Sequence, residues 1–222
     1  MLRIIGGEQR GRKIELPRGG GVRPPTDRVR EAIFNLLRLL VAGRPALDLF
    51  AGSGALGLES LSRGASHVTF VENEPRVVAT LRRNIQHLHY EHCTTVAVAD
   101  VFRWAERFSR WPREPAVVLI APPYAYFDDR LVQLQTLWTT LVDCVPDDTA
   151  IVIQAPQNFR LELLPAGHDW EMRRYGQTQV VIGQTVRTNL PAPSSVDSDE
   201  PESRSTVDEI PNHKLQIPNN LQ

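Results

Sequence analysis

The chain has 222 residues, 41% of them hydrophobic, which is enough for one domain with a sizeable core and short additional segments. The sequence turns polar after Ile5, and no apolar run approaches the roughly 20 residues of a membrane span, so we expect neither a secretory signal nor a membrane partner. Cys93 and Cys144 lack metal-binding or redox spacing, which favours a reduced, cytoplasmic protein; we expect a monomer without a bound metal.

The net charge of -1 hides an uneven distribution of charge along the chain. Residues 1–38 contain nine Arg or Lys against four Asp or Glu, a balance of +5, whereas residues 188–222 contain two against six, a balance of -4. A basic N-terminal part is typical of proteins that bind an anionic partner such as RNA or DNA, although an ordinary solvated surface gives the same count.

The first segment, residues 2–16, contains two short strand patterns separated by a polar turn, which predicts a β-hairpin too small to bury a core alone. Gly and Pro residues between 19 and 25 then indicate an irregular loop. Thr26 is a suitable N-cap for a helix from about Asp27 to Leu40, whose apolar residues recur at helical spacing. We therefore expect an N-terminal β-hairpin extension over residues 1–25.

Strand and helix patterns alternate through the central part of the sequence. The apolar strand patterns are at 46–50, 67–72, 95–99, 117–121 and 150–154, and the helical patterns between them lie near 54–64, 75–90, 101–109 and 128–143. Such alternation predicts an α/β fold with a doubly wound, Rossmann-like, mostly parallel sheet covered by helices on both faces.

Two late strand patterns, near 168–175 and 178–184, are joined at Gly176 and predict an antiparallel hairpin that completes a seven-stranded sheet. We assign residues 26–187 to this domain. The remaining residues, 188–222, are rich in Pro, Ser, Asn and acidic residues and poor in large apolar ones. Such a segment buries too little surface to offset its ordering entropy, so we expect a disordered acidic tail.

The first strand-to-helix turn of the domain is rich in glycine and runs from Asp48 to Gly57 as DLFAGSGALG. Open α/β sheets bind ligands beyond the carboxyl ends of their strands, and glycines there let the backbone approach a ligand closely. Glu72 ends the next strand, where its carboxylate can accept hydrogen bonds from both hydroxyls of a ribose. The same glycines satisfy the dinucleotide pattern G-x-G-x-x-G, so a nicotinamide-dependent oxidoreductase remains an alternative, as does a turn without a ligand.

The fourth predicted strand runs directly into Pro122, Pro123 and Tyr124. Proline cannot continue a sheet ladder, so the strand stops at the carboxyl edge, beside the glycine loop. Its carbonyls are then free to point toward a ligand, and the aromatic ring can stack on a planar base. A strand terminator followed by a core tyrosine is the alternative reading.

The Pro-Pro-Tyr turn resembles a motif of the methyltransferases that act on exocyclic amino groups. In that motif a strand ends in Asp, Asn or Ser, followed by Pro-Pro and then Tyr or Phe. Four further segments narrow this resemblance: RIIGG (3–7), RGRK (10–13), RPPTDRVREAIFN (23–35) and LDLFAGSGALGLESLSRGA (47–65). Together they resemble the RsmD family of 16S rRNA (guanine-N2) methyltransferases over about residues 2–184. The resemblance implies S-adenosyl-L-methionine as cofactor, and 16S ribosomal RNA or a small-subunit assembly particle as partner.

The resemblance also implies roles for individual residues on the cofactor side. Gly52 and Gly54 would lie against the methionine part of the cofactor, Glu72 would hold the ribose, and Asp48 would sit under the loop and orient it. Asp100 would reach the adenine amino group. The implied cofactor-binding residues are Asp48, Phe50, Gly52, Gly54, Glu72, Asn73, Asp100 and Val101, the last lying against the adenine ring.

On the substrate side, Pro122 would offer its carbonyl to the target amine and Tyr124 would stack on a guanine flipped out of its helix. The implied catalytic residues are Ala121, Pro122, Pro123 and Tyr124. Those expected to contact RNA are Arg10, Arg12, Lys13, Arg23, Thr26, Asp27, Arg28 and Arg30. An N-capped, solvated helix start would explain the residues from Thr26 to Arg30 equally simply.

Ala121 departs from the family pattern, which normally carries an Asp at this position. The amine of guanine is a poor nucleophile because its lone pair is delocalised, and an Asp side chain would help to hold it in a reactive geometry. Alanine has no side-chain acceptor, so a weakened enzyme or a non-catalytic RNA- or cofactor-binding module remains an alternative. A methyltransferase acting on DNA adenine is another, and Gln154 on the neighbouring strand is a candidate substitute acceptor.

Overall fold

The computed structural model describes residues 2–17, 25–106, 114–166 and 169–184. All of them belong to the first of the two compact units into which the chain divides, Met1–Arg187 and Thr188–Gln222. The predicted tail, Arg23 and the end of the helix expected at 101–109 lie outside the described residues.

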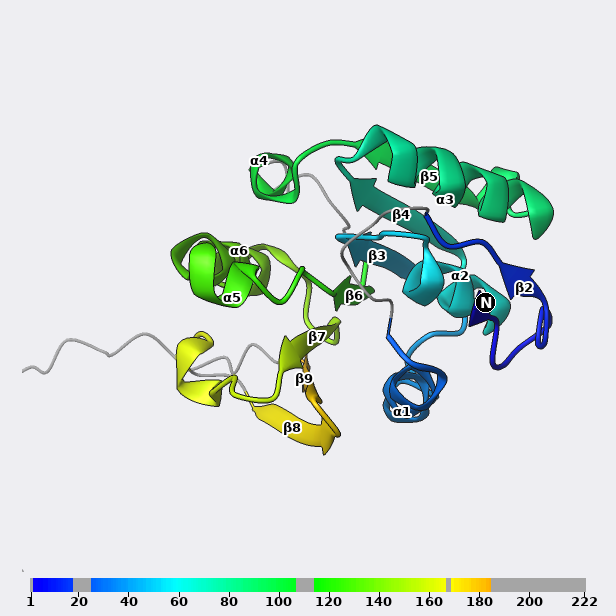
Figure 1. Ribbon diagram of the computed structural model, residues 1–222. Helices are drawn as coiled ribbons and strands as arrows, with labels where there is room; N and C mark the ends of the chain where they lie inside the picture. The colour runs from blue at the N-terminus through cyan, green and yellow to red at the C-terminus, as the bar shows by residue number, and fades with distance from the viewer. Residues whose placement is uncertain (1, 18–24, 107–113, 167–168, 185–222) are drawn as a thin grey trace, which may run out of the picture. The chain divides into compact units, whose positions relative to one another are not determined.

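A seven-stranded sheet forms the centre of the described unit (Figure 1). Its strands are β3 (Pro45–Leu49), β4 (His67–Glu72), β5 (Thr94–Val98), β6 (Val117–Ile120), β7 (Ala150–Pro156), β8 (Trp170–Tyr175) and β9 (Thr178–Gln184). The spatial order is β5-β4-β3-β6-β7-β9-β8, with β3 to β7 parallel and β9 antiparallel to both of its neighbours. The order reverses between β3 and β6, which is where doubly wound sheets bind ligands. The predicted fold class is confirmed, including the late antiparallel hairpin.

Helices cover both faces of the sheet because strand side chains alternate between two apolar layers. One layer contains Ala46 and Val68 together with residues of α1 (Asp27–Leu36), α2 (Ala55–Ser62) and α3 (Pro75–His87). The other contains Leu47 and Leu49 together with residues of α4 (Val101–Ala105) and α6 (Leu131–Cys144). The short helix α5 (Tyr126–Asp129) precedes α6, and two 3-10 turns, η1 (Glu91–Cys93) and η3 (Leu161–Leu163), lie in connections.

The helices predicted near 54–64 and 75–90 are about three residues shorter in the structure, and two other predicted helices differ more. The first ends at Leu36 rather than Leu40, because Leu40 donates its N–H to Leu37 in a turn that leads the chain back toward β3. The helix expected at 128–143 is two helices, α5 and α6, separated by Arg130, whose φ of -135° is not helical. The apolar pattern continues through both positions, so it predicts neither the early end of α1 nor the separation of α5 from α6.

The N-terminal hairpin consists of β1 (Leu2–Arg3) and β2 (Lys13–Ile14), which pair antiparallel. Its apolar side chains Leu2, Ile4 and Ile14 are buried in the layer that contains α1, α2 and α3. The hairpin is therefore packed on the sheet domain, as expected for strands too short to form a core of their own.

Glu59 of α2 fastens this hairpin to the domain. Its carboxylate is fully buried and accepts hydrogen bonds from the backbone N–H groups of Ile5 (2.7 Å) and Gly6 (2.8 Å). Arg63 also donates to it at 2.8 Å, and Nη1 of the fully buried Arg30 lies 3.9 Å away. One side chain thus joins the hairpin, α1 and α2.

We expect Glu59→Gln to destabilise the protein by about 3–5 kcal/mol, because it removes the buried negative charge that faces Arg63 and Arg30 and turns an amide N–H group toward backbone donors. Urea unfolding followed by circular dichroism measures the loss. Glu15→Gln is the matched control: it breaks the exposed Glu15–Arg83 pair (2.9 Å), which should change stability by less than about 1 kcal/mol. Equal losses in the two variants would contradict the role given to Glu59.

Candidate active site at the carboxyl edge of the sheet

The glycine loop between β3 and α2 follows a left-handed backbone path. Phe50, Gly52 and Gly54 have φ values of 60°, 56° and 83°, in the region that favours glycine. At Gly54 a Cβ atom would also lie 2.4 Å from the side chain of Leu81 in α3. The close packing of the loop on α3 therefore requires a glycine at this position.

The carboxylate of Glu72 at the end of β4 holds the loop from one side. Its Oε2 accepts a hydrogen bond from Gly52 N at 2.9 Å, and its Oε1 accepts from Asn73 N and Glu74 N at 3.0 Å. A carboxylate oxygen has two lone pairs, so Oε2 keeps one acceptor position for a ligand hydroxyl. The half-buried side chain is thus fixed in place and still able to bind a ligand.

Asp48 holds the loop from below. Its side chain is buried, and Oδ2 accepts a hydrogen bond from Gly57 N at 2.8 Å, at the start of α2. Burial raises the pKa of Asp48 to about 8; the charge of Glu72 adds to this rise, and the Gly57 hydrogen bond opposes it. A side chain so enclosed can orient the loop but cannot itself contact a ligand at the surface.

The Pro-Pro-Tyr turn begins where β6 ends. Ala121 still donates its N–H to Leu49 of β3 at 3.3 Å, so the turn and the glycine loop leave adjacent strands. Pro122 is buried, while Tyr124 is 38% exposed. The Tyr124 hydroxyl lies 2.7 Å from Thr178 Oγ1 of β9, and Gln154 Nε2 of β7 donates to it at 3.4 Å. The ring is held by its hydroxyl at one end and presents part of its surface at the edge of the sheet.

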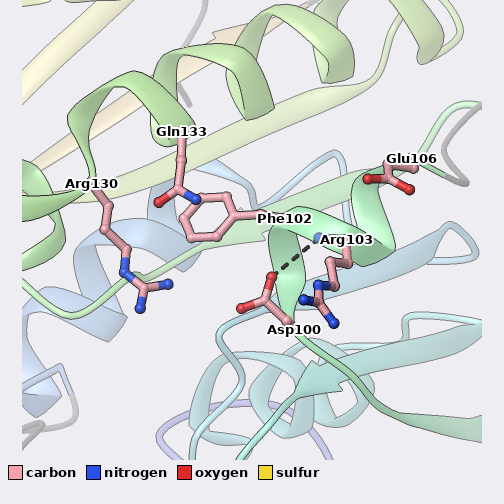
Figure 2. A pocket seen from close by; sticks show the side chains of 6 residues that line it. All are labelled: Asp100, Phe102, Arg103, Glu106, Arg130 and Gln133. Carbon is pink, nitrogen blue, oxygen red and sulfur yellow. Dashed lines mark hydrogen bonds between the residues drawn. The ribbon is translucent and has the colours of Figure 1, made fainter.

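Asp100 lines a cavity of about 370 Å³ near the carboxyl end of β5, together with Phe102, Arg103, Glu106, Arg130 and Gln133 (Figure 2). Its Oδ1 accepts a hydrogen bond from Arg103 N at 3.2 Å and caps α4. Oδ2 makes no capping hydrogen bond, so this oxygen can also bind a ligand. The side chain of Val101, in contrast, is buried in the core and does not line the cavity.

An aromatic cluster beside this cavity was not predicted from the sequence. The rings of Phe50, Phe102 and Tyr126 have centroids 5.7–6.1 Å apart, and the guanidinium of Arg130 lies 4.5 Å from the Tyr126 centroid. These residues come from the glycine loop, α4 and α5, which are far apart in the sequence. The only signal in the sequence is that each aromatic residue lies at, or within five residues after, the end of a predicted strand, and this signal is weak.

The residues expected to contact RNA have different environments. Arg10, Lys13 and Arg28 are exposed, and Arg12 is exposed but donates to the backbone carbonyl of His87 at 2.8 Å. Thr26 is the N-cap of α1 and accepts from Val29 N at 3.3 Å.

Arg30 requires a correction, because its side chain is fully buried. It donates to Arg3 O at 2.7 Å and to Asp27 at 2.8 Å, so it holds the hairpin on α1 and cannot contact RNA in this conformation. Asp27 is likewise engaged, with Arg3 and Arg30, at the start of the helix. Both residues therefore connect the hairpin to α1.

Neither a membrane-spanning helix nor a metal-binding cluster occurs among the described residues. No helix there has the length and apolar character to cross a membrane. No group of three or more His, Cys, Asp or Glu side chains gathers there in an arrangement suited to a metal ion.

Comparisons with known proteins agree with the geometry. A family model described as "Conserved hypothetical protein 95" matches residues 2–184. "Ribosomal RNA small subunit methyltransferase D" of Escherichia coli K12 is 51% identical over 187 residues, covering 83% of this chain and 87% of that protein. The Haemophilus influenzae protein of the same name is 38% identical over 128 residues, covering 56% and 65%. The solved structure of yhhF from Escherichia coli has a TM-score of 0.68 at 30% identity and covers 83% of this chain and 97% of that chain. The chain therefore belongs to the family described as Conserved hypothetical protein 95, the RsmD family that its motifs resemble.

Proposed function

We propose that this protein transfers the methyl group of S-adenosylmethionine to the N2 amino group of a guanine in small-subunit (16S) ribosomal RNA. The observation that carries the proposal is the juxtaposition of the glycine loop, pinned by Glu72, with the Pro-Pro-Tyr turn on the adjacent strand β6. The relatives named as small-subunit ribosomal RNA methyltransferases support the choice of substrate.

The donor set at the glycine loop fits the cofactor. Gly52 and Gly54 present backbone without side chains to its methionine part, and Glu72 retains an acceptor for its ribose. Asp100 has a carboxylate oxygen that makes no capping bond and would accept from the adenine amino group, and Phe50 and Asn73 would border the cofactor. Bound there, the cofactor would supply an electrophilic methyl group on sulfur, while the chain supplies the binding and orientation.

The target base would enter beside the Pro-Pro-Tyr turn. Tyr124, whose ring is fixed by its hydroxyl and partly exposed, would stack on the guanine, and the carbonyl of Pro122 would accept one N–H of the amine. The base must leave its helix or lie in an unpaired loop for this geometry to form. The side chain of Ala121 contributes no acceptor.

The proposal also covers the RNA-binding residues, the partner and the domain bounds. The exposed basic residues of the hairpin would hold the phosphate backbone, and the partner would be 16S rRNA or an assembling small subunit in the cytoplasm, bound by a monomer. Residues 1–25 would form the RNA-side extension, 26–187 the catalytic domain and 188–222 a disordered acidic tail.

Incubation with unmodified small-subunit particles and isotopically labelled S-adenosylmethionine should produce N2-methylguanosine in 16S rRNA, identified by mass mapping of nucleosides. Methylated adenine in a DNA substrate, with unmodified rRNA, would instead favour the DNA methyltransferase. Cofactor binding without methylation of either nucleic acid would favour the binding module.

Glu72→Gln should weaken S-adenosylmethionine binding by about 1.5–3 kcal/mol, because it replaces a charged acceptor by a neutral amide of the same shape. Calorimetry measures the affinity. Glu74→Gln is the control, since that exposed side chain makes no capping bond at the start of α3. Unchanged affinity in a folded Glu72→Gln protein would remove this residue from the cofactor site.

Neutralising the hairpin in the double variant Arg10→Gln/Lys13→Gln should weaken rRNA binding and flatten its salt dependence by roughly 0.7–0.9 in log–log slope for each lost phosphate contact. Arg12 is left intact because it bonds to His87 O. The double variant Arg160→Gln/Arg174→Gln, which removes two exposed charges from β8 and the loop after β7, serves as the control. If both double variants reduce the slope of the salt dependence by the same amount, RNA binding is not localised to the hairpin.

A further inference from the structure

Gln154 is a buried amide with a missing hydrogen bond. Its side chain is 7% exposed, Nε2 donates to Tyr124 Oη at 3.4 Å, and Oε1 has no partner among the described residues. Rotating the amide by 180° would exchange the two atoms without adding a partner, so one polar atom stays unpaired in either orientation. Buried polar groups in native proteins are nearly always paired, and an exception calls for an explanation.

The position of Gln154 in the sheet places it beside Ala121. Ile120 of β6 pairs in register with Ile153 of β7, so Ala121 and Gln154 are the next positions along two neighbouring parallel strands. Val152, two residues before Gln154, and Ala121 both pack in the layer that contains α1, α2 and α3. Because side chains alternate along a strand, Gln154 points to the same face as Ala121.

Tyr124 connects this amide to the site of the base. Its hydroxyl is shared between Gln154 Nε2 and Thr178 Oγ1, which fixes the ring that would stack on the guanine. The unpaired carbonyl of the same amide therefore lies beside that hydroxyl. It is buried in this conformation, so the amide or the Tyr124 ring would have to move as the base binds. None of the described residues donates a hydrogen bond to Gln154 Oε1.

We infer that Gln154 Oε1 accepts one N–H of the target amine and replaces the carboxylate that Ala121 lacks; this rests on the proposed function. In the reaction a bond forms between the amine nitrogen and the methyl carbon while the carbon–sulfur bond breaks and leaves its electron pair on sulfur. The nitrogen then gives one proton to water, since an amide oxygen is too weak a base to take it. Gln154 thus acts by direct contact with the reacting group and leaves proton transfer to solvent.

Single-turnover methylation of small-subunit particles at saturating cofactor tests this directly. Gln154→Leu should slow the step at least tenfold with unchanged cofactor affinity, the scale on which positioned hydrogen-bonding groups act. Ala121→Asp in the Gln154→Leu background should restore the rate, because it returns an acceptor from the neighbouring strand. Gln179→Leu is the matched control: this amide also has an unpaired Oε1, but its side chain lies on the opposite face of the sheet and donates to Gln157 O at 2.6 Å.

A wild-type rate in Gln154→Leu would overturn the inference, and so would a slow rate that Ala121→Asp does not restore, which would indicate lost packing around Tyr124. A measurement of oligonucleotide binding distinguishes failure of this inference from failure of the proposed function. With S-adenosylhomocysteine present, the wild type should bind a guanine oligonucleotide more tightly than its inosine analogue, which lacks the amine, and Gln154→Leu should lose that preference. Preference without methyl transfer would refute the proposed reaction and retain the contact, whereas transfer without preference would refute the contact.

Discussion

The constraint on which the site depends is the left-handed backbone conformation at Phe50, Gly52 and Gly54, which residues other than glycine rarely adopt. Side chains from other segments enforce it: Glu72 accepts from Gly52 N, and Asp48 fixes Gly57 N at the start of α2. Asn84 of α3 donates to Ser53 O at 2.9 Å. Because these bonds come from β3, β4 and α3, the loop keeps its shape only while the surrounding sheet is folded.

The same supports connect the loop to the hairpin. The amide of Asn84 also accepts from Glu15 N at 2.7 Å and donates to Glu15 O at 3.0 Å, so one buried side chain touches both segments. Glu59 provides a second connection through α2, the helix that the loop begins. The strands of the hairpin are only two residues long, so its position depends on these contacts with α2 and α3.

The sequence was sufficient to predict the elements whose signals are local. Strand and helix periodicity gave the sheet and placed the glycine loop and Glu72 at neighbouring strand ends. The 2.9 Å hydrogen bond from Gly52 N to Glu72 was not predicted. Arg30 was misjudged because a buried and an exposed arginine look alike in sequence, and only the packing of the hairpin on α1 distinguishes them. The cluster around Arg130 was missed for a related reason: its members meet only after the chain has folded.

The chemistry of the acceptor matters as much as its position. The carboxyl edge already carries Asp48, Glu72 and Asp100, and the charge of Glu72 contributes to the raised pKa of Asp48. A further carboxylate at 121 would add negative charge beside a turn that buries Pro122. A neutral amide can accept from the same amine without this repulsion, and burying it costs less than burying a charge. Such an exchange would have a chemical consequence, because an amide would orient the nucleophile but stabilise the positive charge that develops on it less than a carboxylate would. An enzyme built in this way would depend more heavily on the stacking provided by Tyr124 to hold the base in line with the methyl group.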